Sequence, residues 1–332
     1  MIKAGPATLH CMEAPQKALL DAAAKDAIAA AFAASDLGHI DEIFGLFLGY
    51  ANVNYRVKTS KGNFLARFCR AQSQQRIHDE ILFLGSIQKS GFPASYPIPR
   101  SDGEYVTHHQ QEKVMIYDFI EGKPPQVNSD SAHQIGQALG CLSLKPIPPG
   151  YTSTALIDIE DLRSFRQEKM TELQQYPEFC DEFLEQTASI EASLPFDLPR
   201  GFVHADAFPD NTIFRDGKLM ALIDFEDSCN DALIFDIGMA IIGFGYLGDT
   251  LDKNLVAALL TGYQSHRKLS VAEQQALPAM ARWCAHGMGF WHLRCYLENP
   301  NQRQHQRIHE LQQMVCGLRE NDGDKILAAF HA

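Results

Sequence analysis

Two short polar segments, each at the end of an apolar run, restrict most strongly what this chain can fold into. The first is Gly201-Phe-Val-His-Ala-Asp-Ala-Phe-Pro-Asp-Asn211, and the second is Leu222-Ile-Asp-Phe-Glu226. Each apolar run has the length and composition of a short buried strand. We therefore expect a strand–loop–strand unit in which Asp206, Asn211 and Asp224 lie close together.

The first segment fits the pattern His-x-Asp-x-x-x-x-Asn, which is typical of phosphoryl-transfer loops. Transfer to a hydroxyl needs a carboxylate that orients the hydroxyl and accepts its proton, and Asp206 suits this role. Mg²⁺ prefers oxygen ligands, which Asn211 and Asp224 would supply. His204 is expected to hold the loop by hydrogen bonds. The alternative is that all of these are ordinary turn and capping residues, but the order and spacing of both segments favour phosphoryl transfer.

The first part of the chain has the pattern of a small antiparallel sheet with two helices. Alanine-rich sequence predicts a helix over 16–35, and a second helical pattern over 73–89 ends at a glycine and a proline. Short apolar or β-branched runs between turn signals predict the strands, which cover 43–49, 53–59, 63–69, 104–108 and 114–119.

One strand of this sheet carries a candidate nucleotide-binding cation. Alternation along residues 63–69 places Leu65 and Arg67 on the same face. In this register Leu65 would cover adenine and Arg67 would bind the α- and β-phosphates of ATP. Glu80 lies on the apolar stripe of the following helix, where a carboxylate needs a cation, and we expect it to pair with Arg67. A solvent-facing arginine and a glutamate in water are the alternatives.

The remaining parts of the nucleotide site follow from order along the chain. The backbone of Asp118 and Ile120 would hydrogen-bond adenine, and residues 49–55 take the hairpin position of a phosphate-covering loop. No Gly-x-Gly-x-x-Gly or Gly-x-x-x-x-Gly-Lys-Ser/Thr segment occurs. This excludes a P-loop enzyme and disfavours a protein kinase.

A Gly- and Pro-containing segment at 121–125 separates this part from a mainly helical remainder. The sequence predicts an α+β, two-lobed, protein-kinase-like fold with a cleft at the joint. The β-rich lobe, residues 1–120, would bind the nucleotide. The larger helical lobe, residues 121–332, would carry the catalytic loop and the substrate pocket. Helices are expected over 129–145, 158–175, 178–193 and from about 232 to 322, with strands at 200–204 and 219–224.

Composition excludes several classes of function. The formal net charge is −12, whereas nucleic acids and anionic membranes bind proteins that present a contiguous basic surface. We therefore expect a small-molecule partner and neither a nucleic acid nor a membrane, although the charge also fits simple solubility. Eight scattered cysteines lack a Cys-x-x-Cys pair, and no apolar stretch has secretory or membrane-spanning length. These features predict a cytoplasmic protein and indicate no oligomeric state.

The chain resembles the aminoglycoside phosphotransferase and choline kinase superfamily, and within it the second type of homoserine kinase. The resemblance covers about residues 40–300 and is carried by residues 49–55, 203–211, 223–231, 259–264 and 290–291. It implies dependence on ATP and Mg²⁺, Asp206 as the base, and Asn211 with Asp224 on magnesium. It also implies a substrate pocket between the catalytic loop and the C-terminal helices.

The resemblance makes the acceptor a hydroxylated small metabolite, with homoserine as the first expectation. Gly289 stands where homoserine kinases carry an arginine, so that Arg294, further along the same helix, would bind the acceptor carboxylate, with Trp291 as a pocket wall. Glu226 and Asp227 add acid near the pocket. A choline, ethanolamine or aminoglycoside kinase is the alternative enzyme, and a nucleotide-binding pseudokinase is the alternative from another class.

Overall fold

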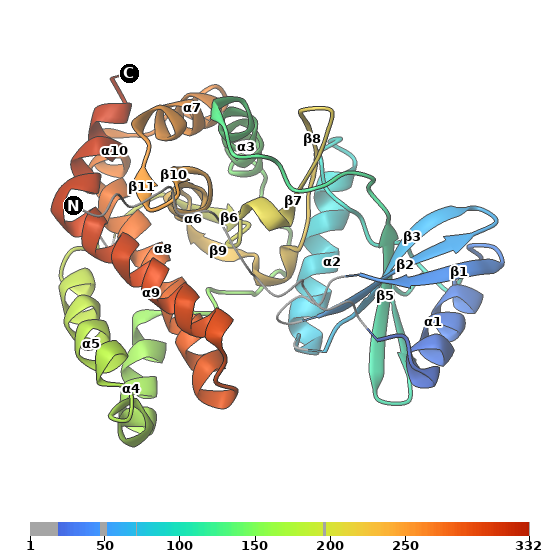
Figure 1. Cartoon of the computed structure of the whole chain (residues 1–332). Helices are drawn as coiled ribbons and strands as arrows, with labels where there is room; N and C mark the ends of the chain where they lie inside the picture. The colour runs from blue at the N-terminus through green and yellow to red at the C-terminus, as the bar shows by residue number, and fades with distance from the viewer. Residues whose placement is uncertain (1–18, 47–51, 71, 195–196, 332) are drawn as a thin grey trace, which may run out of the picture. The chain divides into compact units, whose positions relative to one another are not determined.

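The structure is a computed structural model that describes residues 19–46, 52–70, 72–194 and 197–331 (Figure 1). The chain divides into two compact units, one of residues 1–84 and 95–120 and the other of residues 85–94 and 121–332. In the described part of the chain, no helix combines the length and apolarity that crossing a membrane requires.

The first unit is built on one antiparallel sheet of five strands in the order β1-β2-β3-β5-β4. Strand β3 pairs with β5 and not with β4, the next strand in the sequence. Strand β4 pairs only with β5 and therefore lies at an edge of the sheet. Each predicted strand of this region has an observed counterpart. The observed strands are β1 (Ile40–Gly45), β2 (Val53–Thr59), β3 (Gly62–Phe68), β4 (Val106–His109) and β5 (Glu112–Asp118). Part of the predicted strand at 43–49, and of the loop at 49–55, lies outside the described residues.

Helix α1 (Ala22–Ala34) covers one face of this sheet. It begins later than predicted because the Asp21 side chain accepts a hydrogen bond from the Ala24 N–H and caps the helix there. Its buried Ile28 and Phe32 pack with the strand residues Tyr55, Val57, Ala66, Phe68, Val114 and Ile116. Helix α2 (Gln74–Gln88) follows β3, close to the predicted bounds.

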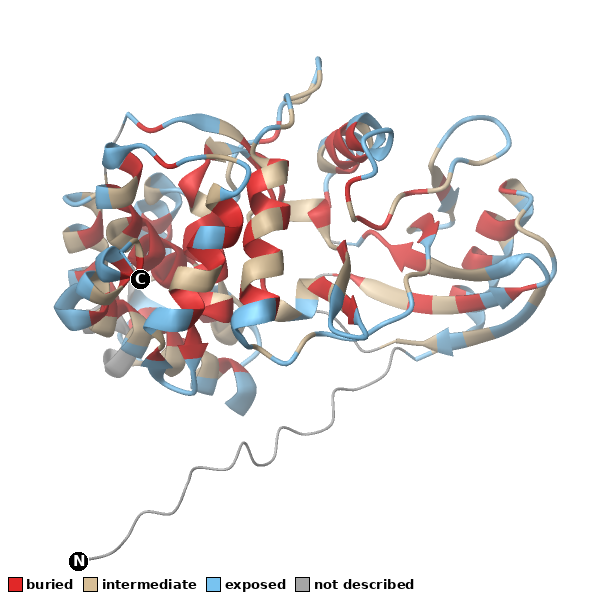
Figure 2. Ribbon diagram, turned by 90° about the horizontal axis from the view of Figure 1, so that it is seen from above, coloured by how far each residue is buried: buried red, intermediate tan, exposed pale blue. Residues whose placement is uncertain are grey.

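The second unit is mainly helical, and Figure 2 shows in red the buried residues of its core. Its helices are α3 (Ser129–Leu142), α4 (Ile159–Leu173), α5 (Pro177–Glu191), α6 (Ile234–Phe244), α7 (Lys253–Gln264), α8 (Val271–Glu298), α9 (Gln302–Gly317) and α10 (Gly323–Ala329), with a π-helical turn over Leu318–Asp322. Short antiparallel pairs join β6 (Arg200–Val203) to β9 (Cys229–Ala232), β7 (Thr212–Arg215) to β8 (Lys218–Leu222), and β10 (Tyr246–Leu247) to β11 (Thr250–Leu251).

Strands β7, β9, β10 and β11 were not predicted, and the expected helical stretch from 232 to 322 is broken by the β10–β11 hairpin. The β7–β8 hairpin has a sequence signal that could have revealed it. Asp216 and Gly217 lie between two apolar runs, and both adopt positive φ angles, of 52° and 75°. An Asp-Gly pair in this conformation is the preferred two-residue hairpin turn.

Helices α3 and α7 approach so closely that only glycine fits between them. A Cβ atom on Gly136 would lie 2.0 Å from the Leu259 carbonyl oxygen, and one on Gly262 would lie 2.1 Å from the His133 carbonyl oxygen. Both obstacles are backbone atoms, which cannot rotate away. The contact therefore fixes the distance between the two helices.

We expect Gly262→Ala to lower the free energy of unfolding of the second unit by about 3 kcal/mol or more, because a helix must shift to admit the methyl group. Urea denaturation followed by tryptophan fluorescence measures this, since Trp283 and Trp291 both lie in α8. The control is Gly85→Ala in α2, where nothing lies within 4 Å of the added Cβ. That change should stabilise the protein by up to about 1 kcal/mol. Equal effects of the two substitutions would refute the close approach.

Candidate active site

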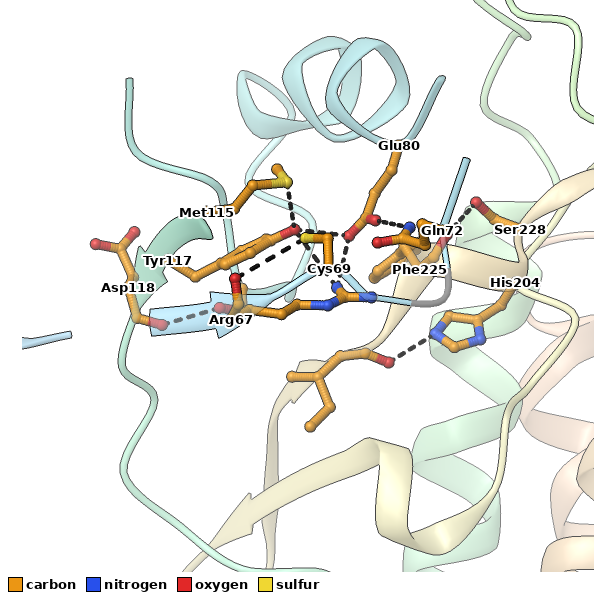
Figure 3. A network of polar contacts seen from close by, with 12 residues as sticks. Arg67, Cys69, Gln72, Glu80, Met115, Tyr117, Asp118, His204, Phe225 and Ser228 are labelled. Carbon is orange, nitrogen blue, oxygen red and sulfur yellow. Dashed lines mark hydrogen bonds and ion pairs between the residues drawn. The ribbon is translucent and has the colours of Figure 1, made fainter. Parts of the chain in front are cut away.

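The imidazole of His204 holds the loop that follows β6. The ring is fully buried, and each of its nitrogens has a partner in the backbone. The Asp206 N–H donates to Nδ1 over 3.2 Å, so that Nε2 carries the proton and donates to the Ile223 carbonyl over 3.0 Å (Figure 3). The ring also packs against Phe225, with the centroids 4.5 Å apart. The hydrogen bonds expected of His204 are therefore present.

A second buried group, Asp236 in the first turn of α6, fixes the same loop from the other side. Its carboxylate accepts one hydrogen bond from the His204 N–H and one from the Ala205 N–H, each of 2.9 Å. Ala205 has a φ of 68°, a conformation that costs a non-glycine residue about 1 kcal/mol or more. Burial raises the pKa of Asp236 to about 7, although the two hydrogen bonds act in the opposite direction. Sequence reasoning missed this residue.

Asn211 lies against Asp206, as the spacing of the motif predicts. Its Nδ2 donates to the Asp206 Oδ2 over 2.6 Å and to the Asp206 carbonyl oxygen over 2.9 Å. Asn211 ends a short 3₁₀ turn, Pro209–Asn211, directly before β7. Because the amide donates through Nδ2, its Oδ1 is the atom that can serve as an oxygen ligand.

The β7–β8 hairpin places Asp224 near Asn211. The register pairs Thr212 with Leu222, and the Ile223 N–H donates to the Asn211 carbonyl over 3.0 Å. Asp224 follows directly, with a φ of 67° that turns the chain into the 3₁₀ turn Phe225–Asp227. The structure thus brings together the three side chains that the two sequence segments predicted to meet.

Acidic charge gathers around Asp206. Burial raises the pKa of the Asp206 carboxyl well above its usual range, and the charges of Asp227, Asp224 and Asp210 raise it further, while the hydrogen bond from Asn211 opposes them. The sequence analysis gave Asp210 no role beyond its turn. Such a cluster is costly without a cation.

The oxygen donors here fit Mg²⁺. Within the described residues no group of three or more His, Cys, Asp or Glu side chains could by itself hold a metal ion. Mg²⁺ at phosphate-transfer sites commonly takes only one or two carboxylates, and phosphate oxygens and water complete its shell. Asn211 and Asp224 match that limited donor set.

In the first unit, Arg67 and Glu80 form the expected ion pair. Arg67 Nη1 lies 3.0 Å from Glu80 Oε1, and the two side chains are only 5% and 2% exposed. Glu80 also accepts hydrogen bonds from the Tyr117 hydroxyl at 2.9 Å and from Gln72 Nε2 at 2.8 Å (Figure 3). Burial and the Glu80 charge raise the pKa of Tyr117 well above its usual range. Tyr117 and Gln72 therefore complete a network that the sequence indicated only in part.

The other predicted nucleotide contacts lie beside this pair. Leu65 is half-buried and faces Tyr117 across the β3–β5 ladder. The Asp118 N–H donates to the Tyr96 carbonyl over 3.2 Å, and the Asp118 carbonyl accepts from Ser95 over 2.9 Å. That carbonyl keeps a second lone pair for a ligand, and Ile120, beyond the strand end, is half-buried. Their contacts with a nucleotide stay predictions.

Asn54 adds a polar atom that the sequence analysis passed over. It is the β2 partner of Arg67, and its buried Oδ1 has no hydrogen-bond partner in the described part of the chain. Buried acceptors without partners are rare in folded proteins. A bound nucleotide that offers a donor or a cation at this position would satisfy it.

The residues predicted to bind the acceptor fall into two groups. Glu226 and Asp227 lie in the 3₁₀ turn after Asp224, next to the acidic cluster. Arg294 and Trp291 lie on α8, where the Arg294 guanidinium carbon is 5.7 Å from the Phe290 ring centroid and the Trp291 ring packs edge-on against His292. These α8 contacts do not join either residue to the catalytic loop, and the roles of all four stay predictions.

Position 289 faces another helix. A Cβ atom on the buried Gly289 would lie 3.8 Å from the Leu311 Cβ of α9. A long side chain at this position would therefore start in contact with α9. Gly289 itself has no side chain and so supplies no cation for an acceptor.

Residues 46–280 match the phosphotransferase enzyme family. The chain belongs to this family. It is 29% identical over 265 residues to a homoserine kinase of Rhizobium meliloti (strain 1021), an alignment that covers 76% of this chain and 79% of the relative. It is 31% identical over 266 residues to a homoserine kinase of Brucella ovis (strain ATCC 25840 / 63/290 / NCTC 10512), which covers 75% of this chain and 78% of the relative.

Solved structures support the same fold. A microcompartment-associated aminopropanol kinase superposes with a TM-score of 0.68 at 15% identity, covering 91% of this chain and 99% of that one. A choline/ethanolamine kinase family protein from Mesorhizobium loti gives 0.59 at 16% identity, with 85% and 90% covered. The predicted α+β, kinase-like fold is confirmed. The protein is a small-molecule kinase, and its family implies that it uses ATP, so the predicted enzyme class is confirmed as well.

The raised pKa of Asp236 predicts a specific pH dependence of stability. In the unfolded chain this carboxyl ionises near pH ~4, whereas the folded protein keeps the proton up to about pH 7. Its stabilising contribution is thus complete below pH ~4 and is lost as the pH rises through 7. Relative to Asp236→Asn, which does not titrate, the wild type should lose up to about 1.4 kcal/mol of unfolding free energy per pH unit in this window. Urea denaturation at pH 5.5 and 7.5 measures this, and a difference that does not change with pH would contradict it.

Proposed function

We propose that this kinase transfers the γ-phosphoryl group of magnesium-bound ATP to the hydroxyl of homoserine. The observation that carries the proposal is the contact of Asp206 with Asn211 inside a cluster of carboxylates that needs a cation. The names of the relatives from Rhizobium meliloti and Brucella ovis support homoserine as the acceptor.

Each residue of the catalytic loop would have a separate task. Asp206 would orient the acceptor hydroxyl and receive its proton, because its Oδ2 is positioned by Asn211 and its backbone by His204. Asn211 Oδ1 and the Asp224 carboxylate would hold Mg²⁺. When bound, the ion would neutralise charge on the phosphates. Since Asp206 would bind no metal, it would stay available to the hydroxyl.

Arg67 would bind the ATP phosphates. A buried guanidinium is costly unless its charge is balanced, and Glu80 provides that balance at 3.0 Å. Tyr117 and Gln72 hold Glu80 through further hydrogen bonds, so that the cation keeps its position before a nucleotide arrives. This preorganisation supports binding, since little ordering remains to be done.

A second acceptor class is favoured by a specific observation. The carboxylates around Asp206 suit an ammonium group, which homoserine shares with cationic amino alcohols. The carboxylate of homoserine needs a cation in addition, and Gly289 provides none because glycine has no side chain. The exposed Arg294 is the candidate on α8. An amino-alcohol kinase is therefore the alternative.

We expect Asp206→Asn to lower kcat by about 10²- to 10⁴-fold, because the amide cannot accept the hydroxyl proton. Steady-state phosphate transfer measures the loss, and circular dichroism shows that the fold persists. Asp216→Asn is the matched control, since Asp216 is an exposed residue of the β7–β8 turn at a positive φ that asparagine tolerates. Turnover within a few-fold of the wild type in the Asp206 variant would exclude Asp206 as the base.

A pair of acceptors distinguishes the two substrate classes. Homoserine and 3-aminopropan-1-ol differ only in the carboxylate, so a site that binds the carboxylate should favour homoserine by roughly 10³-fold or more in kcat/KM. Arg294→Gln should reduce this preference at least tenfold, whereas Arg303→Gln, an exposed arginine of α9, should leave it unchanged. A preference for the amino alcohol would replace homoserine with the alternative class.

A further inference from the structure

Four side chains form a row across the sheet of the first unit. The ladders pair Phe44 with Arg56, Arg56 with Leu65, and Leu65 with Tyr117. Directly opposed residues in antiparallel strands point to the same face of a sheet. The row therefore runs from β1 to β5 on a single face.

This face is the one that carries the Arg67–Glu80 pair. Along β3, Leu65 and Arg67 alternate with Ala66 and Phe68, which pack under α1 on the opposite face. Tyr117, the last member of the row, donates its hydroxyl hydrogen bond to Glu80. Arg56 thus lies on the ligand side of the sheet, and the other three members of its row are apolar or aromatic.

The guanidinium of Arg56 lies close to two aromatic rings. Its carbon lies 4.8 Å from the ring centroid of Phe119 and 5.8 Å from that of Phe44, and its Nε donates to Asn63 Oδ1 over 3.3 Å. Arg56 is half-buried, and Phe44 is 40% exposed. A charged side chain with no ligand role more often extends into water. Here a planar group instead lies near two rings, one of which, Phe119, stands between Asp118 and Ile120 in the sequence.

We propose that the nucleotide base stacks on the guanidinium of Arg56, which would make Arg56 a residue that determines affinity for the base. The inference rests on the proposed role of Arg67 in binding phosphate. Leu65, the strand partner of Arg56, precedes Arg67 by two residues, a spacing of about 7 Å along a strand. A nucleotide anchored at Arg67 with its base over Leu65 would bring the base against Arg56. Guanidinium groups stack readily on planar π systems.

Binding measurements with two ligands test this separately from catalysis. Isothermal titration calorimetry of the full chain with ATP and with inorganic tripolyphosphate, both in excess Mg²⁺, compares a ligand that has a base with one that has none. We expect Arg56→Leu to raise the Kd for ATP about tenfold and to leave the Kd for tripolyphosphate unchanged. Arg56→Lys, which keeps the charge and loses the planar group, should weaken ATP binding as well. Lys58→Leu is the control, since Lys58 is the next outward residue of β2 on the same face and is exposed.

The outcomes separate the two proposals. Arg67→Met should weaken both ligands, and wild-type protein that binds neither ligand would refute the proposed function itself. If the wild type binds ATP and Arg56→Leu binds it equally well, only the stacking proposal fails. Equal losses for ATP and tripolyphosphate would also overturn it, because Arg56 would then act on the phosphates or on the sheet. Thermal melting of each variant identifies any loss that comes from unfolding.

Discussion

One buried carboxylate holds the turn from which the catalytic loop starts. Asp236 accepts the N–H groups of His204 and Ala205 at the point where Ala205 takes a left-handed conformation. Without those two acceptors, the amides would be buried donors without partners, and the strained conformation would lose its compensation. The direction of the Asp206 side chain follows from this turn. The chemistry proposed for the loop therefore depends on a residue that would touch no reactant.

The acidic cluster around Asp206 and the hydrogen-bonded network around Arg67 differ in how their charges are balanced. Around Asp206, several carboxylates gather and Asn211 donates a hydrogen bond to the Asp206 carboxylate, an arrangement suited to a cation that arrives with the substrate. Around Arg67, a buried cation is neutralised within the protein by Glu80, which Tyr117 and Gln72 hold in place. The acidic cluster would thus attract a cation from outside, whereas the Arg67 charge is already balanced within the protein. This asymmetry fits a kinase that binds phosphate on a rigid surface and acquires its metal with the nucleotide.

Contacts between residues close in sequence could be predicted, and contacts set by tertiary packing could not. Alternation along β3 and the helical stripe of α2 were sufficient to pair Arg67 with Glu80, because both patterns are local. The proximity of Asn211 and Asp224 was expected from the order and spacing of the two segments, although the β7–β8 hairpin that joins them was not predicted. The role of Asp236 was not predicted because an aspartate in the first turn of a helix usually caps that helix. Nothing in its spacing indicates a contact with a loop 32 residues earlier. The role of Gln72 was not predicted because it lies outside regular secondary structure, where no periodicity indicates which way a side chain points.

In the proposed function, the choice of acceptor would depend on residues of the turn after Asp224 and of α8. Glycine at position 289 supplies no cation, and a Cβ added there would lie 3.8 Å from the Leu311 Cβ of α9. Asp227, whose charge acts on Asp206, lies in the 3₁₀ turn whose Phe225 packs on His204 of the catalytic loop. An acceptor whose ammonium group pairs with that turn would have its hydroxyl position set by the distance between the two groups. Chain length between amine and hydroxyl, more than the rest of the acceptor, would then limit which alcohols react.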